Sequence, residues 1–318
     1  MQAFNGNQAL KDELVGRVRA QWAAGQLVAG GGLLWDEEKS LFSINGALAQ
    51  TADAAEFESR TGIALDVALL CESTLALSVV AVKDKTKKIG YASIHDPALD
   101  SAVTAWLDAI RPGADLQSVI PKFMVYFLEF VLSNDYAQRD YVPADVRAVA
   151  QKILNNWKSE LGGQTVDAKT WRQVRGEAVQ ASEQITQAWA YPIAHFVETM
   201  AWPLPTMTKE FRQPFMFITG NLLSFLQSPF HVDEDKRLSE LALLGHLKMR
   251  EQDREGKTAP EDRQALLDAN PDIKEAMTWF SDDERNARVK RGQQKAFAAT
   301  TPVVKQFMDK LVTFIKEA

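Results

Sequence analysis

The residues best suited to metal chemistry are a few histidines and carboxylates in the C-terminal half of the chain. His195 and Glu198 form a His-x-x-Glu pair that can share one face of a helix, and His231, Asp233 and His246 follow further along. Imidazole and carboxylate groups are common ligands of divalent metals. The set predicts a metal-dependent enzyme if the fold brings these side chains together. No histidine pair at four-residue spacing supports such a site, so the favoured expectation is that the chain holds no cofactor.

Two acidic clusters could bind magnesium through carboxylate oxygens. They are residues 233–235 and residues 282–284. Each also stands where a helix is expected to begin, and negative charge is favourable at the positive end of a helix. A helix start is therefore the favoured explanation for both clusters.

A basic segment follows the second acidic cluster and could contact phosphate groups or an acidic protein surface. Its residues are Arg285, Arg288, Lys290, Arg291 and Lys295. The adjacent acids partly cancel this charge, and Phe297 is the one aromatic side chain nearby. Nucleic-acid binding usually combines such a patch with stacking side chains. The segment favours a solvated helix face, with nucleic-acid binding as the alternative.

Standard nucleotide-binding and nucleophile motifs are absent from the sequence. Residues 30–32 are three glycines, but no Walker lysine follows them, and the chain contains no Gly-x-Ser-x-Gly elbow. Cys71 lies in an apolar run, which is typical of an inert core thiol. Local motifs thus give no indication of a catalytic reaction.

Aromatic residues and prolines crowd together over residues 187–230. The favoured interpretation is the core of a C-terminal domain. The alternative is a docking surface, because aromatic side chains are enriched at the centres of protein interfaces. The candidate docking residues are Trp202, Phe211, Phe215 and Phe217, together with Arg285, Arg288 and Arg291 from the basic segment.

Composition predicts a folded protein without a membrane anchor. The chain has 318 residues, of which 46% are hydrophobic, and a net charge of -6 that offers no general attraction to nucleic acid or anionic lipid. A single cysteine and an N-terminus unlike a signal peptide predict a cytoplasmic location. Residues 63–82 have the length of a membrane span, but Asp66 and Glu72 interrupt them and favour a buried helix.

Hydrophobic periodicity predicts a mostly all-α protein built as a two-domain helical bundle. Gly162 and Gly163 mark the expected boundary, which gives an N-terminal helical domain over 1–162 and a C-terminal one over 163–318. Residues 77–82 and 89–94 could instead pair as one small β-hairpin across the basic loop 83–88. Helices are expected over 7–29, 96–110, 142–161 and 171–189, and a last one from Thr301 and Pro302 onward.

Three segments of the N-terminal half resemble an uncharacterised helical family of prophage and bacterial proteins. They are residues 10–20, 57–63 and, most clearly, 110–123, and they occur in the family's order. Members of that family carry a Gly-Cys step after the first helix, where this chain has residues 41–46 without cysteine. The resemblance implies a helical fold and a mobile-element context, and no activity.

Together these features favour a non-enzymatic helical interaction or accessory protein, phage- or prophage-borne, that binds a protein partner or itself. Amphipathic helices are abundant and catalytic motifs are lacking. The metal-dependent enzyme and the nucleic-acid-binding protein described above remain the two alternatives.

Overall fold

The computed structural model describes residues 1–29, 32–77, 92–93, 100–133, 142–210, 213–257, 259–279 and 282–318. Of the residues that the structure describes, 77% are helical. Its strands within these ranges form two short antiparallel pairs, β1 (Val28–Ala29) with β4 (Ala92–Ser93) and β2 (Trp35–Asp36) with β3 (Leu41–Phe42). The expectation of a mostly all-α protein is confirmed.

The first helix is shorter than its periodicity predicts. It is α1 (Gln8–Ala23), capped by the side chain of Asn7, which accepts a hydrogen bond from the amide of Leu10. The chain leaves the helix before Gly25, whose positive φ of 65° favours glycine, and Leu27 then joins a β-bridge to Phe42. The predicted extension to residue 29 is therefore wrong.

The segment that follows is a tight strand pair packed onto a short helix. The rings of Trp35 and Phe42 stack with centroids 4.2 Å apart across β2 and β3. Gly46 lies in α2 (Ile44–Ala49) against the backbone of Leu34, and a Cβ atom at this position would lie 1.7 Å from the carbonyl oxygen of Leu34. Two helices complete this part, α3 (Ala54–Thr61) and α4 (Leu65–Ala76).

Several expectations fall on residues outside the described ranges. They are most of the proposed hairpin over 77–94, the basic loop 83–88, the helix start at residues 96–97 and the docking residue Phe211. Of the hairpin, Leu77 follows α4, and residues 92–93 form β4, which pairs with β1.

One hydrophobic core runs through most of the molecule and has α6 (Val119–Leu132) near its centre. Phe127 of α6 meets Phe307 of α15 (Asp283–Glu317) edge to face, with centroids 5.2 Å apart. Helices from both sides of Gly162 contribute to this core, so the division into two domains stays a prediction. The other helices around it are α5 (Asp100–Ala109), α7 (Ala144–Leu161), α8 (Ala168–Glu183), α9 (Tyr191–Met200), α10 (Leu204–Glu210) and α11 (Pro214–Gln227).

Two helices near prolines differ from the sequence-based expectation. The helix expected over 171–189 is α8, which already ends at Glu183, and Pro192 stands in the first turn of the next long helix, α9. Proline is tolerated there because its missing amide would have no helical partner. Pro302 does not begin the last helix, because it lies inside the 35-residue α15.

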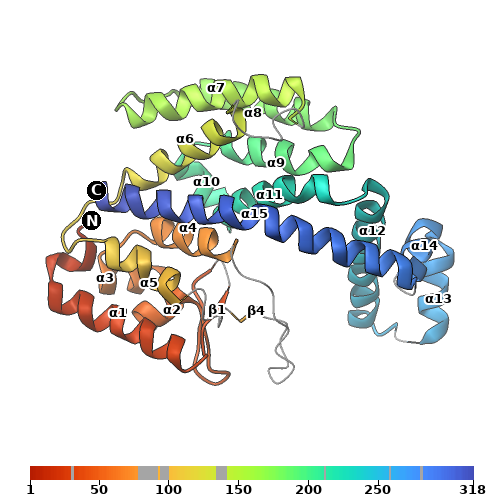
Figure 1. Ribbon diagram of the computed structural model, residues 1–318, viewed down its shortest axis with the longest axis horizontal. Coiled ribbons are helices and arrows are strands. Elements are labelled where there is room, and N and C mark those ends of the chain that lie inside the picture. Colours follow the sequence, from red (N-terminus) through yellow and green to blue (C-terminus); the bar gives the residue numbers. More distant parts are fainter. Residues whose placement is uncertain are drawn as a thin grey trace.

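Three helices form an arm at one end of the molecule, which Figure 1 shows beside the main body. They are α12 (Asp233–Arg254), α13 (Pro260–Asp268) and α14 (Pro271–Trp279), called the arm below. The arm has a small core of its own, made of Leu238, Ala242, Ala276 and Trp279. The N-terminal part of α15 packs beside the arm, and its C-terminal part enters the main core, so that one helix joins the two.

Within the described residues, no helix is both long and apolar enough to cross a membrane.

Candidate functional site

The predicted His195 and Glu198 pair forms, and it lies on the surface of α9. His195 Nδ1 is 3.6 Å from Glu198 Oε2, and 53% of the histidine side chain is exposed. The imidazole also stacks on Tyr191 with ring centroids 6.2 Å apart. Two neighbouring side chains on one helix turn supply at most part of a metal site.

The remaining predicted ligands lie elsewhere. His231 lies between η5 (Ser228–Phe230) and α12, Asp233 is in the first turn of α12, and His246 is exposed further along that helix. In the part of the chain that the structure describes, no group of three or more His, Cys, Asp and Glu side chains could hold a metal ion. The five candidates therefore do not form one site.

The predicted docking aromatics separate into buried and exposed residues. Phe215 is 1% exposed and belongs to the main core, whereas Phe217, two positions along α11, is 55% exposed. Trp202 is half-buried beneath the guanidinium of Arg175, which lies 4.0 Å from the ring centroid. The aromatic segment thus serves mainly as core.

Arg288 connects α15 to the arm. Its Nε donates to Asp235 Oδ2 at 2.7 Å, and its Nη2 donates to Asp235 Oδ1. These hydrogen bonds from Arg288 hold the pKa of Asp235 below its ordinary value, and Trp279 of α14 lowers that pKa further. Asp235 is only 4% exposed, and its carboxylate connects α12 to α15.

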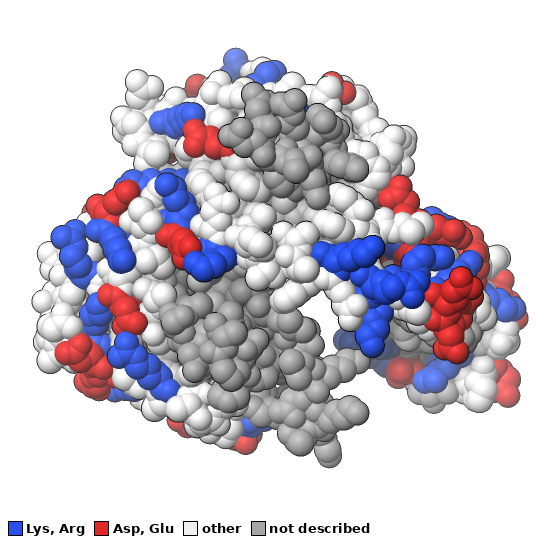
Figure 2. Space-filling model, viewed as in Figure 1, with Lys and Arg blue, Asp and Glu red and all other residues white. Residues whose placement is uncertain are grey.

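The surface around Arg288 carries charge of both signs. Figure 2 shows the basic side chains near the base of the arm immediately next to acidic ones. Arg285 is half-buried and Arg291 is exposed. Because Asp235 engages the middle arginine of the predicted patch, fewer positive charges are available there than the sequence indicates.

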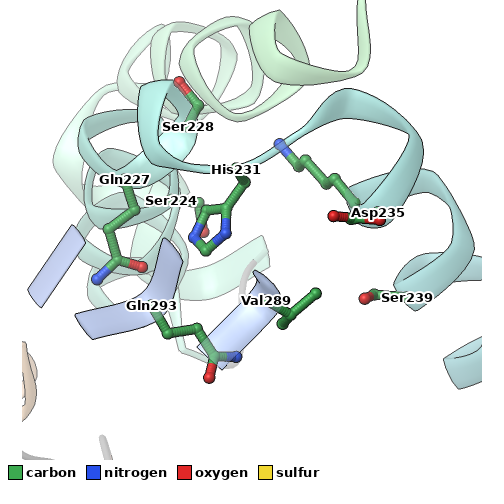
Figure 3. Close-up of a pocket in the computed structure, with 9 residues that line it drawn as sticks. Ser224, Gln227, Ser228, His231, Asp235, Ser239, Val289 and Gln293 are labelled. Atoms are coloured by element: carbon green, nitrogen blue, oxygen red, sulfur yellow. The ribbon is translucent and has the colours of Figure 1, made fainter. Parts of the chain in front are cut away.

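A cavity of about 210 Å³, lined mainly by residues of polar type, lies at the junction between the body and the arm (Figure 3). His231 points into it. The other lining residues come from α11, η5, α12 and α15, and they are Ser224, Gln227, Ser228, Asp235, Lys236, Ser239, Val289 and Gln293. Partial burial, followed by the charge of Lys236, lowers the pKa of His231.

This cavity offers hydrogen bonds rather than an assembled catalytic group. Its carboxylate, Asp235, is held by Arg288, which makes it a poor metal ligand or general base. Near this cavity α15 approaches η5 closely at Gly292, where a Cβ atom would lie 2.7 Å from the carbonyl oxygen of Phe230. Close approach of α15 to η5 therefore requires glycine.

The most exposed apolar side chains of the arm lie on the face of α12 that is turned away from α14. Leu243 is 60% exposed, Leu244 is 43% exposed and Leu247 is 53% exposed. Their spacing of three and four residues places them side by side on one face of the helix. The buried Leu238 and Ala242 lie on the opposite face, which packs against α14. We call the three exposed leucines the leucine face.

Charged residues border the leucine face. They are Arg237, Glu240, Arg250 and Glu251. Within the described residues none of these four forms an ion pair, although the same arm pairs Arg263 with Asp253 and Lys274 with Asp268. On the side toward Asp272 of α14, the face continues into a shallow groove of about 290 Å³ that Leu241 and Leu244 help to line.

The leucine face is not among the sites predicted from the sequence, although one signal in the sequence indicates it. The stretch 238–247 contains five leucines, at positions 238, 241, 243, 244 and 247, which are too widely spread around the helix for a single buried stripe. Two apolar faces on one helix indicate two partners, and α14 accounts for only one of them.

No family model, curated protein or solved structure matches the chain.

Proposed function

We propose that this chain is a non-enzymatic helical interaction protein that docks a protein partner through the leucine face of α12. The observation that carries the proposal is the exposure of Leu243, Leu244 and Leu247 on an arm whose own core lies on the other side of the helix. The fold does not use these side chains, so their exposure needs a reason outside it.

The energetics support docking of moderate strength. Full burial of a leucine side chain is worth about 1.5–3 kcal/mol. Because roughly half of each of the three side chains is already covered, a partner would gain about 1 kcal/mol from each leucine. An amphipathic helix laid along α12 is a suitable partner, since such helices bind apolar faces through side chains spaced three and four residues apart.

The two alternative functions receive less support. Among the described residues, the histidines and acids proposed for a metal-dependent enzyme do not form a group that could hold a metal ion. Nucleic-acid binding would depend on the basic segment of α15, where Arg288 is already engaged with Asp235. The mobile-element context and the cytoplasmic location belong to the same proposal, and the single buried Cys71 is consistent with a reducing compartment.

Site-specific photo-crosslinking in cells tests the proposal. A photoreactive amino acid replaces Leu247, and an otherwise identical chain carries it at Leu161, which is an exposed apolar residue of α7. We expect a protein adduct from position 247 and none from position 161. The adduct should disappear when Leu243→Ser is added, because that change removes a neighbouring contact.

Absence of any adduct at position 247 would refute docking through this face. An adduct that persists unchanged with Leu243→Ser would also refute it, because the contact would then not depend on the leucines.

A further inference from the structure

We infer that the partner of the leucine face is a second copy of this chain, whose α12 lies antiparallel to the first. This inference rests on the proposed function and specifies its partner. It depends on the order of charges along the face, which is complementary to itself when reversed.

The register follows from the leucines. In an antiparallel pair, the two helices run in opposite directions past each other, and Leu243 of one copy can lie opposite Leu247 of the other. A two-fold axis then passes between the copies and makes both contacts equivalent, as in most homodimers. Leu244 approaches its own counterpart beside this axis.

The charges agree with that register. One turn beyond the leucines, Glu240 of one copy lies opposite Arg250 of the second copy, and symmetry repeats the pair on the other side. On the flank of the interface, Arg237 lies near Glu251 of the second copy. These four residues form no ion pair within the described part of their own chain, so they are available to a second copy.

A parallel arrangement lacks this complementarity. It would bring Glu240 next to Glu240 of the second copy and Arg250 next to Arg250, so that like charges would meet. The antiparallel register has two like-charged contacts of its own: Glu240 lies near Glu251 of the second copy on one flank, and Lys236 lies opposite Arg254 at the ends of α12. There, Glu240 and Asp233 of its own chain partly balance the charge of Lys236.

The expected association is weak. Two paired 22-residue helices bury less than about 1,200 Å², which is the range of transient complexes. The chain should therefore exchange between a 35.4 kDa monomer and its dimer at micromolar concentrations, and sedimentation velocity over a concentration series measures this directly.

Charge reversal gives the decisive test. Glu240→Arg and Arg250→Glu should each weaken the dimer about tenfold, because each change places like charges at both symmetric contacts. The double variant Glu240→Arg/Arg250→Glu should recover the original affinity. A mixture of the two single variants should also associate, since every contact between them is complementary. Within one chain the two residues are ten positions apart on α12 and cannot compensate each other.

Leu243→Ser/Leu247→Ser should abolish the dimer while circular dichroism stays unchanged, because both side chains are exposed in the monomer. A native chain that remains monomeric at about 100 µM, well above the range expected for an interface of this size, would overturn the inference. A dimer whose affinity is unchanged by both the charge reversals and the leucine substitutions would also overturn the inference. If crosslinking from position 247 then captures a different protein, the proposed function stands and only the self-pairing fails.

Discussion

Replacing Asp235 with asparagine should loosen the arm while leaving the main body unchanged. Asp235 is 4% exposed and accepts two hydrogen bonds from Arg288, and its carboxylate is the charged contact between α12 and α15. Among the described residues, the buried apolar side chains of the arm are Leu238, Ala242, Ile273, Ala276 and Trp279, and Val289 of α15 packs against this small core. The ion pair therefore adds to a limited apolar contact.

The magnitude follows from the contact that is lost. Hydrogen bonds to a charged group contribute about 1.5–3 kcal/mol. Because Arg288 keeps partial contact with water, at 42% side-chain exposure, we expect a loss near the lower end, at about 2 kcal/mol for the Asp235 carboxylate. A change of that size raises the population of the open arm by about thirtyfold.

Hydrogen exchange measured by mass spectrometry resolves this effect by region. Amides of α12 and α14 should exchange about thirtyfold faster in Asp235→Asn, and amides of α6 in the main core should not change. Asp268→Asn is the matched control, because Asp268 pairs with Lys274 in the same arm but on its exposed surface. Unchanged exchange in α12, or an equal increase in α6, would refute the role assigned to Asp235.

Three further predictions follow from the structure. First, Arg288 holds the pKa of Asp235 below its ordinary value of 3.8. A carboxyl group whose pKa is lower in the folded chain stabilises the fold at any pH above its unfolded pKa. That stabilisation is lost as the pH falls through the folded pKa. The difference in unfolding free energy between the native chain and Asp235→Asn should therefore shrink below about pH 4, and a constant difference down to about pH 2 would contradict this. Second, Gly46→Ala should lower the melting temperature sharply, because the added Cβ atom would overlap the carbonyl oxygen of Leu34. Gly176→Ala in α8, where the added Cβ atom would have open space around it, should instead stabilise the chain by about 0.5–1 kcal/mol. Thermal denaturation of both variants measures the two effects, and equal shifts in melting temperature would refute the packing around Gly46. Third, burial raises the pKa of the Cys71 thiol, which is 0% exposed, so iodoacetamide should label it only on unfolding; rapid labelling of the native chain would show that its surroundings open.

Much of the fold is predictable from local sequence rules. The 3.6-residue spacing of apolar side chains predicts the helix over 142–161, which is α7, and Pro143 and Gly162 mark its ends. Helix boundaries fail where a longer-range contact decides them. Leu27 continues the stripe of the first helix but lies in a β-bridge with Phe42, and no local pattern contains that information.

The candidate site is less predictable, because it depends on which surface remains uncovered. The leucines of α12 look alike in sequence, and only the position of α14 separates Leu238, in the arm's core, from Leu243, on the exposed face. The ion pair of Arg288 is likewise not predictable from the sequence, since its partner Asp235 is 53 positions away in the chain. Side chains that meet through tertiary packing have no fixed spacing.

The long helix α15 has a consequence for how the chain folds. Phe307 and Leu311 of that helix are 0% exposed and fill the core beside α6, and α15 also contacts α4, α5 and α11. On a ribosome, the earlier helices are synthesised well before α15 and cannot cover their apolar faces until it emerges. Contacts so distant in sequence slow folding and leave incomplete chains prone to aggregation. Nascent chains halted before α15 should therefore depend on a chaperone, which would release them once the last helix is in place.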